Sequence, residues 1–120
     1  MEADVVLLSI GRKPYTKGLD VGKAGLELNQ RGQVPINKTW QTAKPHIYAI
    51  GDVVEGPMLA HKAEEEGIAA VEHLLGKGGH VNYDAIPGVI YTHPEVANVG
   101  LSEEQLKEAG VNYNVGTFPF

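Results

Sequence analysis

The sequence predicts an α/β fold, in which short apolar strands of a parallel sheet lie beside helices. Residues 5–10 (VVLLSI) and 47–50 (IYAI) are brief apolar runs, each closed by a glycine, and such runs are typical of buried strands. Apolar and small residues then recur at helical spacing between Gly56 and Gly76, which predicts one long amphipathic helix. The 120 residues are enough for one modest hydrophobic core.

The amino-terminal third is expected to hold several short elements in succession. The strand at 5–10 leads through a turn-rich loop into a short helix within residues 19–25, which ends at a glycine. Residues 26–36 are predicted to form a hairpin with its turn at Arg31-Gly32. Residues 40–43 add a further short strand just before the strand at 47–50.

The long helix is predicted to begin at Pro57, because proline lacks a backbone donor that would be unpaired at that position anyway. Lys62 and Glu66 are expected outside the apolar stripe, as a weak exposed pair contributing about 0.3 kcal/mol. The glycine-rich segment 76–79 ends the helix. The predicted stripe comprises Leu59, Ala63, Gly67, Ala70, Val71 and Leu74.

The last third predicts two strands, one helix and the start of a third strand. Residues 89–92 and 96–99 are the two strands, on either side of His93-Pro94-Glu95. The sequence SEEQ at 102–105 is a capping box, so a helix is expected from there to the next glycine. Residues 111–118 then begin another strand.

Composition excludes several classes of function. Ten Lys and Arg against fifteen Asp and Glu give a net charge of −5, and without a basic stripe the chain is not expected to bind nucleic acid. No apolar run has the length needed to cross a bilayer. The absence of cysteine excludes a thiolate metal site and a cysteine nucleophile within the chain. The five histidines lack any metal-binding spacing, so no metal is expected.

The residues themselves point to one candidate site, at the end of the strand 47–50. Ligands of parallel sheets bind beyond the carboxyl ends of the strands, where the carboxylate of Asp52 could accept hydrogen bonds from a hydroxyl group. A plain turn residue that satisfies nearby backbone donors is the alternative, and the commoner one for a Gly-Asp pair. The start of the following helix presents positive potential to an anionic ligand edge. Its amides would be those of Met58, Leu59, Ala60 and His61.

Five stretches of the chain resemble the pyridine nucleotide–disulfide oxidoreductases. Residues 42–52 (TAKPHIYAIGD) are similar to the second flavin motif of that family, and residues 10–14 (IGRKP) to its crossing back from the nicotinamide domain. Residues 56–67 (GPMLAHKAEEEG), 91–97 (YTHPEVA) and 116–120 (GTFPF) resemble the members that oxidise dihydrolipoyl groups. The resemblance covers almost the whole chain without a gap.

The resemblance implies three unequal pieces of a larger enzyme. Residues 1–11 would be the last strand of the NAD domain, residues 12–79 the returning half of the FAD domain, and residues 80–120 the start of the dimerisation domain. The family also implies a homodimer that serves 2-oxo acid dehydrogenase complexes, in the mitochondrial matrix or the bacterial cytoplasm.

The resemblance also implies a role for each candidate residue. Asp52 would bind the ribityl hydroxyls of FAD, and Gly11 would lie near the nicotinamide of NAD. The backbone amides of the helix start would face the pyrimidine edge of the flavin, where negative charge gathers on reduction. These amides belong to Met58, Leu59, Ala60 and His61.

The chain departs from the family in what it lacks. Both glycine loops for the dinucleotides, the redox pair of cysteines and the catalytic His-Glu pair are absent, so no catalytic residue is assigned and the chain alone is expected to be inactive. Two alternatives stay open. The chain could be a non-catalytic association module that binds no cofactor, or part of a sibling reductase that acts on mercury or another disulfide.

Overall fold

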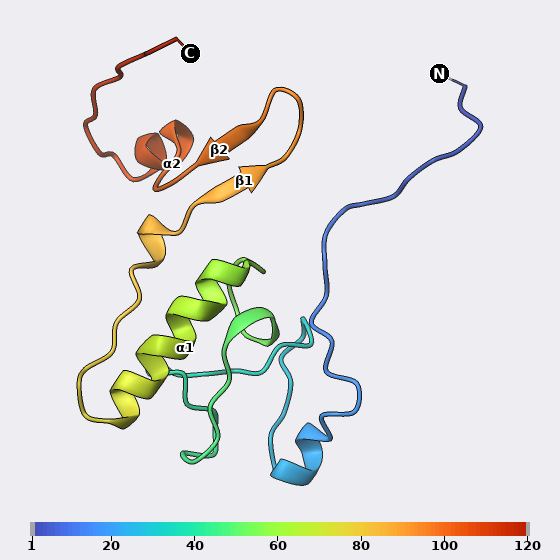
Figure 1. The fold of residues 1–120 in the computed structure, drawn as a ribbon, viewed down its shortest axis with the longest axis vertical. Coiled ribbons are helices and arrows are strands. Elements are labelled where there is room, and N and C mark those ends of the chain that lie inside the picture. The colour runs from blue at the N-terminus through green and yellow to red at the C-terminus, as the bar shows by residue number, and fades with distance from the viewer. Residues whose placement is uncertain (1, 120) are drawn as a thin grey trace. The chain divides into compact units, whose positions relative to one another are not determined.

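The computed structural model describes residues 2–119, which divide into two compact units between Val81 and Asn82. The first unit contains helix α1 (Ala60–Leu74). The second contains strands β1 (Gly88–Ile90) and β2 (Val96–Asn98) and helix α2 (Glu103–Glu108), as Figure 1 shows. Helix and strand are both present, as predicted, but no parallel sheet forms within residues 2–119. No helix in this part of the chain is long and apolar enough to span a membrane.

Two single-turn 3-10 helices shape the first unit. The first, η1 (Val21–Ala24), ends at Gly25 in the left-handed region, which confirms the short helix predicted there. The second, η2 (Gly51–Val53), follows the predicted strand 47–50 and packs against α1. Within residues 2–119, the buried apolar side chains all lie in the first unit. They are Leu26, Val34, Trp40, Val54, Ala69, Ala70 and Val81.

The predicted hairpin at residues 26–36 exists as a turn without flanking strands. The side chain of Asn29 accepts hydrogen bonds from the amides of Arg31 and Gln33, both at 2.9 Å, which closes the turn. Beyond it the Val34 amide donates to the Val53 carbonyl at 2.8 Å. The turn is thereby tied to the segment that carries η2.

The strands predicted at 40–43 and 47–50 are reduced to a single antiparallel bridge between Gln41 and Tyr48. The Thr42 amide donates to the Ile47 carbonyl at 2.9 Å, and the Ala49 amide donates to Trp40 at 3.0 Å. The prediction of two strands is therefore wrong in length. The chain reverses so tightly between these segments that only one bridging pair forms.

The strand predicted at residues 5–10 is also wrong for this structure. The segment runs as an extended trace without a ladder (Figure 1). Its apolar side chains are 75–88% exposed. A strand needs a hydrogen-bonded neighbour, and no other part of residues 2–119 supplies one here.

Helix α1 begins at Ala60, three residues later than predicted. Leu59 is the residue just before the helix, in an extended conformation with φ −130° and ψ 135°. The Leu59 amide donates to the Pro57 carbonyl at 3.1 Å, so residues 57–59 form a tight local turn. The Ala63 amide then donates to the Leu59 carbonyl at 3.1 Å, as expected at the start of an α-helix.

The buried face of α1 differs from the predicted stripe. Lys62 and Glu66, expected outside the stripe, are fully buried, whereas Val71 and Leu74 are more than half exposed. The buried face is completed by Ala69 and Ala70. The helix therefore presents one ion pair and two alanines to the core of this unit.

The second unit agrees with the sequence in its hairpin and in the start of its helix. β1 and β2 pair antiparallel, with Val89 opposite Ala97. The capping box is complete, because the Ser102 amide donates to the Gln105 side chain at 2.8 Å and the Gln105 amide donates to the Ser102 hydroxyl at 3.3 Å. Residues 111–118 form no strand, contrary to the prediction.

An exposed ionic cluster joins α2 to the chain that follows it. Lys107 Nζ lies 2.8 Å from the Glu103 carboxylate, which also accepts a hydrogen bond from the Tyr113 hydroxyl. The bond from Lys107, followed by the one from Tyr113, lowers the pKa of Glu103. The carboxylate in turn raises the pKa of Tyr113 above its ordinary value.

Candidate functional site

The candidate site is built around Gly51, whose two backbone groups are both bonded to side chains of α1. The Gly51 amide donates to Glu66 Oε2 at 2.7 Å. The Gly51 carbonyl accepts from Lys62 Nζ at 3.1 Å and from the Val54 amide at 3.2 Å. Since Lys62 and Glu66 are one turn apart on α1, they hold η2 directly against the helix.

Lys62 and Glu66 also form an ion pair with each other. Lys62 Nζ lies 3.1 Å from one Glu66 oxygen and 3.2 Å from the other, and the two side chains are 0% and 1% exposed. A buried pair of this kind is favourable only when further hydrogen bonds satisfy both ions. Gly51 supplies one such bond to each partner.

Two glycines allow the close approach of the loop to α1. Gly51 has φ +73°, and a Cβ atom there would lie 3.1 Å from the Cβ of Ala63. Gly56 has φ +116°, and a Cβ atom there would lie 2.9 Å from Cε of Lys62. Larger residues at these positions would push the loop away from the helix.

Asp52 lies in the middle of η2, and its side chain is exposed. The neighbouring backbone is held from two directions, by α1 at Gly51 and by the Val34 amide at the Val53 carbonyl. The carboxylate is therefore presented to solvent on a fixed turn. This is the geometry required of a hydrogen-bond acceptor for a ligand that carries hydroxyl groups.

The first turn of α1 provides a different set of amides from the one predicted. The Leu59 amide is already bonded to Pro57, and Met58 lies outside the helix. Ala60 and His61 are the predicted site residues that lie within the first turn, and both are exposed. No side chain caps this end of the helix. A helix start of this kind presents positive potential to an anionic ligand edge.

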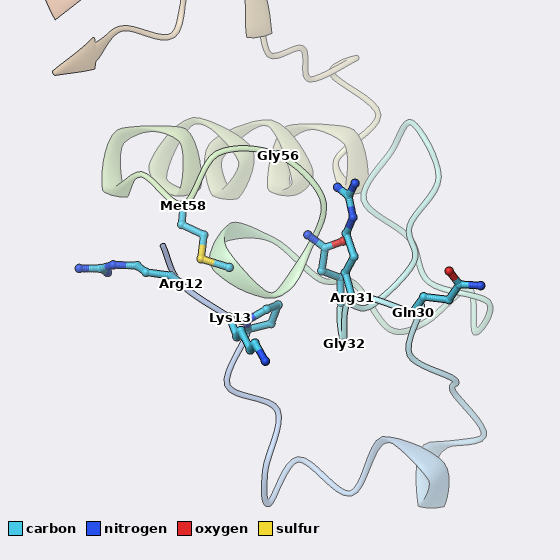
Figure 2. Close-up of a pocket in the computed structure, with 9 residues that line it drawn as sticks. Arg12, Lys13, Gln30, Arg31, Gly32, Gly56 and Met58 are labelled. Atoms are coloured by element: carbon cyan, nitrogen blue, oxygen red, sulfur yellow. The ribbon is translucent and has the colours of Figure 1, made fainter. Parts of the chain in front are cut away.

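A cavity of about 740 Å³ lies next to the segment that leads into α1. Gly56 and Met58 line it, together with residues 12–14 and residues 30–33 (Figure 2). The charged ends of Arg12, Lys13 and Arg31 point in different directions in this view. The cavity therefore has cationic surroundings but no convergent set of charges around one point.

Gly11 is exposed and has φ +129°, with no atom within 4 Å of the position a Cβ would take. It precedes Arg12, which lines the cavity. The structure thus brings Asp52 and the start of α1 together through η2 and leaves Gly11 on an open segment. Within residues 2–119, no group of three or more acidic, histidine or cysteine side chains is arranged to hold a metal ion.

Sequence reasoning predicted the pair Lys62–Glu66 but missed its burial and its bonds to Gly51. The spacing of four was visible, and so was its continuation at Ala69 and Ala70, which places all four on one face of a helix. The presence of Gly56 before the helix was a second signal, since a glycine permits a long side chain to pass beneath the loop. Charge alone suggested an exposed pair, because lysine and glutamate are seldom buried.

Comparison with known proteins shows the family to which the chain belongs. Residues 1–67 match the model of the pyridine nucleotide-disulphide oxidoreductase family, and residues 86–120 match the dimerisation domain of the same family. The chain belongs to the pyridine nucleotide-disulphide oxidoreductase family. This confirms the resemblance seen in the sequence.

Several curated proteins are similar to this chain over nearly its whole length. The chain is 60% identical over all 120 residues to dihydrolipoyl dehydrogenase 1, mitochondrial, of Arabidopsis thaliana, and 61% identical over 117 residues to the mitochondrial dihydrolipoyl dehydrogenase of Homo sapiens. It is also 59% identical over 120 residues to leghemoglobin reductase of Glycine max. The alignments cover 98–100% of this chain and 23–24% of each relative. The chain spans about a quarter of the length of these relatives.

Solved structures show the same relationship. The flavoprotein disulfide reductase RclA of Escherichia coli has a TM-score of 0.75 and 31% identity, over 85% of this chain and 24% of its own. LpdA of Mycobacterium tuberculosis has a TM-score of 0.77 and 29% identity, over 88% of this chain and 23% of its own. The backbone described above is thus similar to part of each of these two proteins.

Proposed function

We propose that this chain is part of a dihydrolipoyl dehydrogenase, an FAD enzyme that passes electrons from dihydrolipoyl groups to NAD. The observation that carries the proposal is the exposed Asp52 on a turn fixed to the first turns of α1. The 59–61% identity with the plant and human relatives, which extends along essentially the whole chain, supports the same assignment.

The described residues fit one end of FAD. Asp52 is an exposed acceptor for the ribityl hydroxyls, and the uncapped start of α1 presents the amides of Ala60 and His61 to the pyrimidine edge. Bound FAD would supply the two-electron chemistry. The helix start would stabilise the negative charge that develops on reduction. Met58 and Leu59 would contribute through side chains or the adjoining turn, because the Leu59 amide is already bonded to Pro57.

The proposal assigns the remaining chemistry to other parts of a longer polypeptide. The chain contains no cysteine, so the disulfide that exchanges with dihydrolipoyl groups must lie elsewhere. Residues 1–11 would close the NAD domain, with Gly11 near the nicotinamide, and residues 12–79 would complete the FAD domain. Residues 80–120 would open the dimerisation domain of a homodimer, in keeping with the family match there.

We also infer the compartment and the partners of the enzyme. The plant and human dihydrolipoyl dehydrogenases that the chain resembles are named mitochondrial, which supports the mitochondrial matrix over the bacterial cytoplasm. Enzymes that reoxidise dihydrolipoyl groups work with carriers of those groups, so 2-oxo acid dehydrogenase complexes would be the partners.

The test compares two acidic residues that are three positions apart and both exposed. Asp52→Ala in the full-length polypeptide should weaken FAD binding about tenfold to a hundredfold, since a hydrogen bond to a charged acceptor contributes about 1.5–3 kcal/mol. Glu55→Ala should leave FAD binding unchanged. Both are measured from the 450 nm absorbance retained after dialysis and from the NAD-dependent oxidation of dihydrolipoamide. Equal loss in the two variants, or none in either, would contradict the proposal.

A sibling reductase is the second candidate, favoured by the 59% identity with leghemoglobin reductase. The same FAD contacts would then serve a different electron acceptor. The full-length polypeptide distinguishes the two when dihydrolipoamide with NAD is compared with protein disulfides and ferric leghemoglobin as substrates. A specificity constant highest for dihydrolipoamide supports the first candidate.

A further inference from the structure

The ion pair of α1 is a buried charged cluster of the first unit, and the proposed FAD contacts assign no role to it. Lys62 and Glu66 are almost completely enclosed, yet neither belongs to the predicted set of cofactor-binding residues. Fully buried charges are costly, and replacing such a pair with apolar residues is often neutral or stabilising. The pair is therefore poorly explained by stability alone.

Its geometry indicates what it does. The bonds of the pair to the loop converge on Gly51, the residue immediately before Asp52. Glu66 accepts from the Gly51 amide at 2.7 Å, the shortest of these contacts and one strengthened by the charge of the acceptor. Lys62 donates to the Gly51 carbonyl at 3.1 Å and neutralises Glu66 at 3.1–3.2 Å.

We propose that Glu66, neutralised in its buried place by Lys62, is a positioning residue whose bond to the Gly51 amide sets the place of Asp52 relative to the first turn of α1, and so the affinity of the site for FAD. This inference rests on the proposed function. Glu66 is the anchor, because it holds the Gly51 amide. Lys62 allows that carboxylate to remain charged in a buried place, and its stem fills the space beneath Gly56.

The exposed pair of α2 shows what the same residue types do elsewhere. Glu103 and Lys107 also lie four apart on a helix, but their side chains are 53% and 63% exposed, and no contact joins them to a loop that carries a candidate ligand residue. Lysine precedes glutamate in α1, which is the weaker order for an exposed helical pair. Burial and the bonds to Gly51 therefore distinguish the pair of α1.

The test compares the loss of the two charges with the loss of the oxygen that accepts from the Gly51 amide. In the full-length polypeptide, Lys62→Met with Glu66→Gln removes both charges but keeps an amide oxygen that accepts from Gly51. Lys62→Met with Glu66→Met removes the charges and the acceptor together. Neither double variant leaves a buried ion without its partner. Glu103→Gln with Lys107→Met is the matched control.

The FAD dissociation constant is measured by flavin fluorescence quenching for each variant. We expect it to rise about tenfold or more for the Met–Met variant, and by no more than about twofold for the Met–Gln variant and the α2 control. Hydrogen exchange of the peptide containing residues 51–53, measured without FAD, should be faster in the Met–Met variant only. Melting temperatures of the apoproteins show whether the affinity follows stability instead.

The outcomes distinguish this inference from the function on which it rests. Failure of the unsubstituted polypeptide to bind FAD would overturn the proposed function. Normal FAD binding with equal affinities in the two double variants, or affinities that merely follow the apoprotein melting temperature, would overturn the positioning role alone. A difference between the two double variants at matched melting temperature supports it.

Discussion

Removing one member of the buried ion pair should have a larger effect than any other single charge removal in the chain. Lys62→Met keeps the length and volume of the side chain, so it opens little cavity at a site that is 0% exposed. It leaves the Glu66 carboxylate buried without its cation. The Gly51 carbonyl keeps one donor, the Val54 amide, so most of the cost is the uncompensated charge.

The magnitude follows from that burial. Breaking a buried ion pair by removing one partner costs about 3–5 kcal/mol. With a urea m-value of about 1–1.5 kcal/mol/M for a small unit, the unfolding midpoint should fall by about 2–5 M. This is a large fraction of the total stability of a small domain, which is about 5–15 kcal/mol.

Trp40 provides the assay, since it is the single tryptophan of the chain and is 4% exposed in the core of the first unit. Its fluorescence reports the unfolding of this unit in urea. Lys107→Met is the control, because Lys107 is 63% exposed and its pair lies in the second unit. A midpoint for Lys62→Met within error of the unsubstituted chain, or a shift equal to that of the control, would refute the reasoning.

Two further predictions concern a glycine and the ionic cluster of α2. Gly51→Ala should destabilise the first unit by about 1–3 kcal/mol more than Gly32→Ala in the same urea assay, because both positions have φ near +75° but only Gly51 would meet a neighbouring side chain. Glu103→Gln should lower the pKa of Tyr113, followed by absorbance at 295 nm, because the carboxylate raises it. Since the pKa of Glu103 is depressed in the folded chain, its stabilising effect is present above the unfolded pKa and is lost as the pH falls through the folded value. A Tyr113 titration that Glu103→Gln leaves unchanged would count against the cluster.

Local signals predicted the second unit well. The capping box at Ser102 and Gln105 and the hairpin of β1 and β2 depend on residues close together in the sequence, and both are present. The short helix that ends at Gly25 was predicted for the same reason. Such features depend on interactions between residues that are close in the sequence, so the sequence is sufficient to predict them.

Features that depend on distant partners were predicted less well. The apolar run at residues 5–10 has the composition of a buried strand, but strand formation needs neighbours, and residues 2–119 offer none to it. The start of α1 moved because residues 57–59 close a local turn of their own. The propensity of Pro57 for a first helical position therefore did not determine where α1 begins.

The candidate site was predicted in part. Asp52 and the nearby start of α1 were recognised from their order in the sequence. The side chains that hold Gly51 against the helix were not recognised. Lys62 and Glu66 were placed outside the buried face because charged residues usually are. Their burial depends on the backbone of Gly51, fifteen residues before Glu66, and residue type alone does not reveal that partner.

A structure of the full-length polypeptide with FAD bound tests the central claim most directly. The account predicts a carboxylate oxygen of Asp52 about 2.5–3.0 Å from a ribityl hydroxyl, with the first amides of α1 at the pyrimidine edge of the flavin. A flavin bound elsewhere, with Asp52 and those amides hydrated, would contradict it.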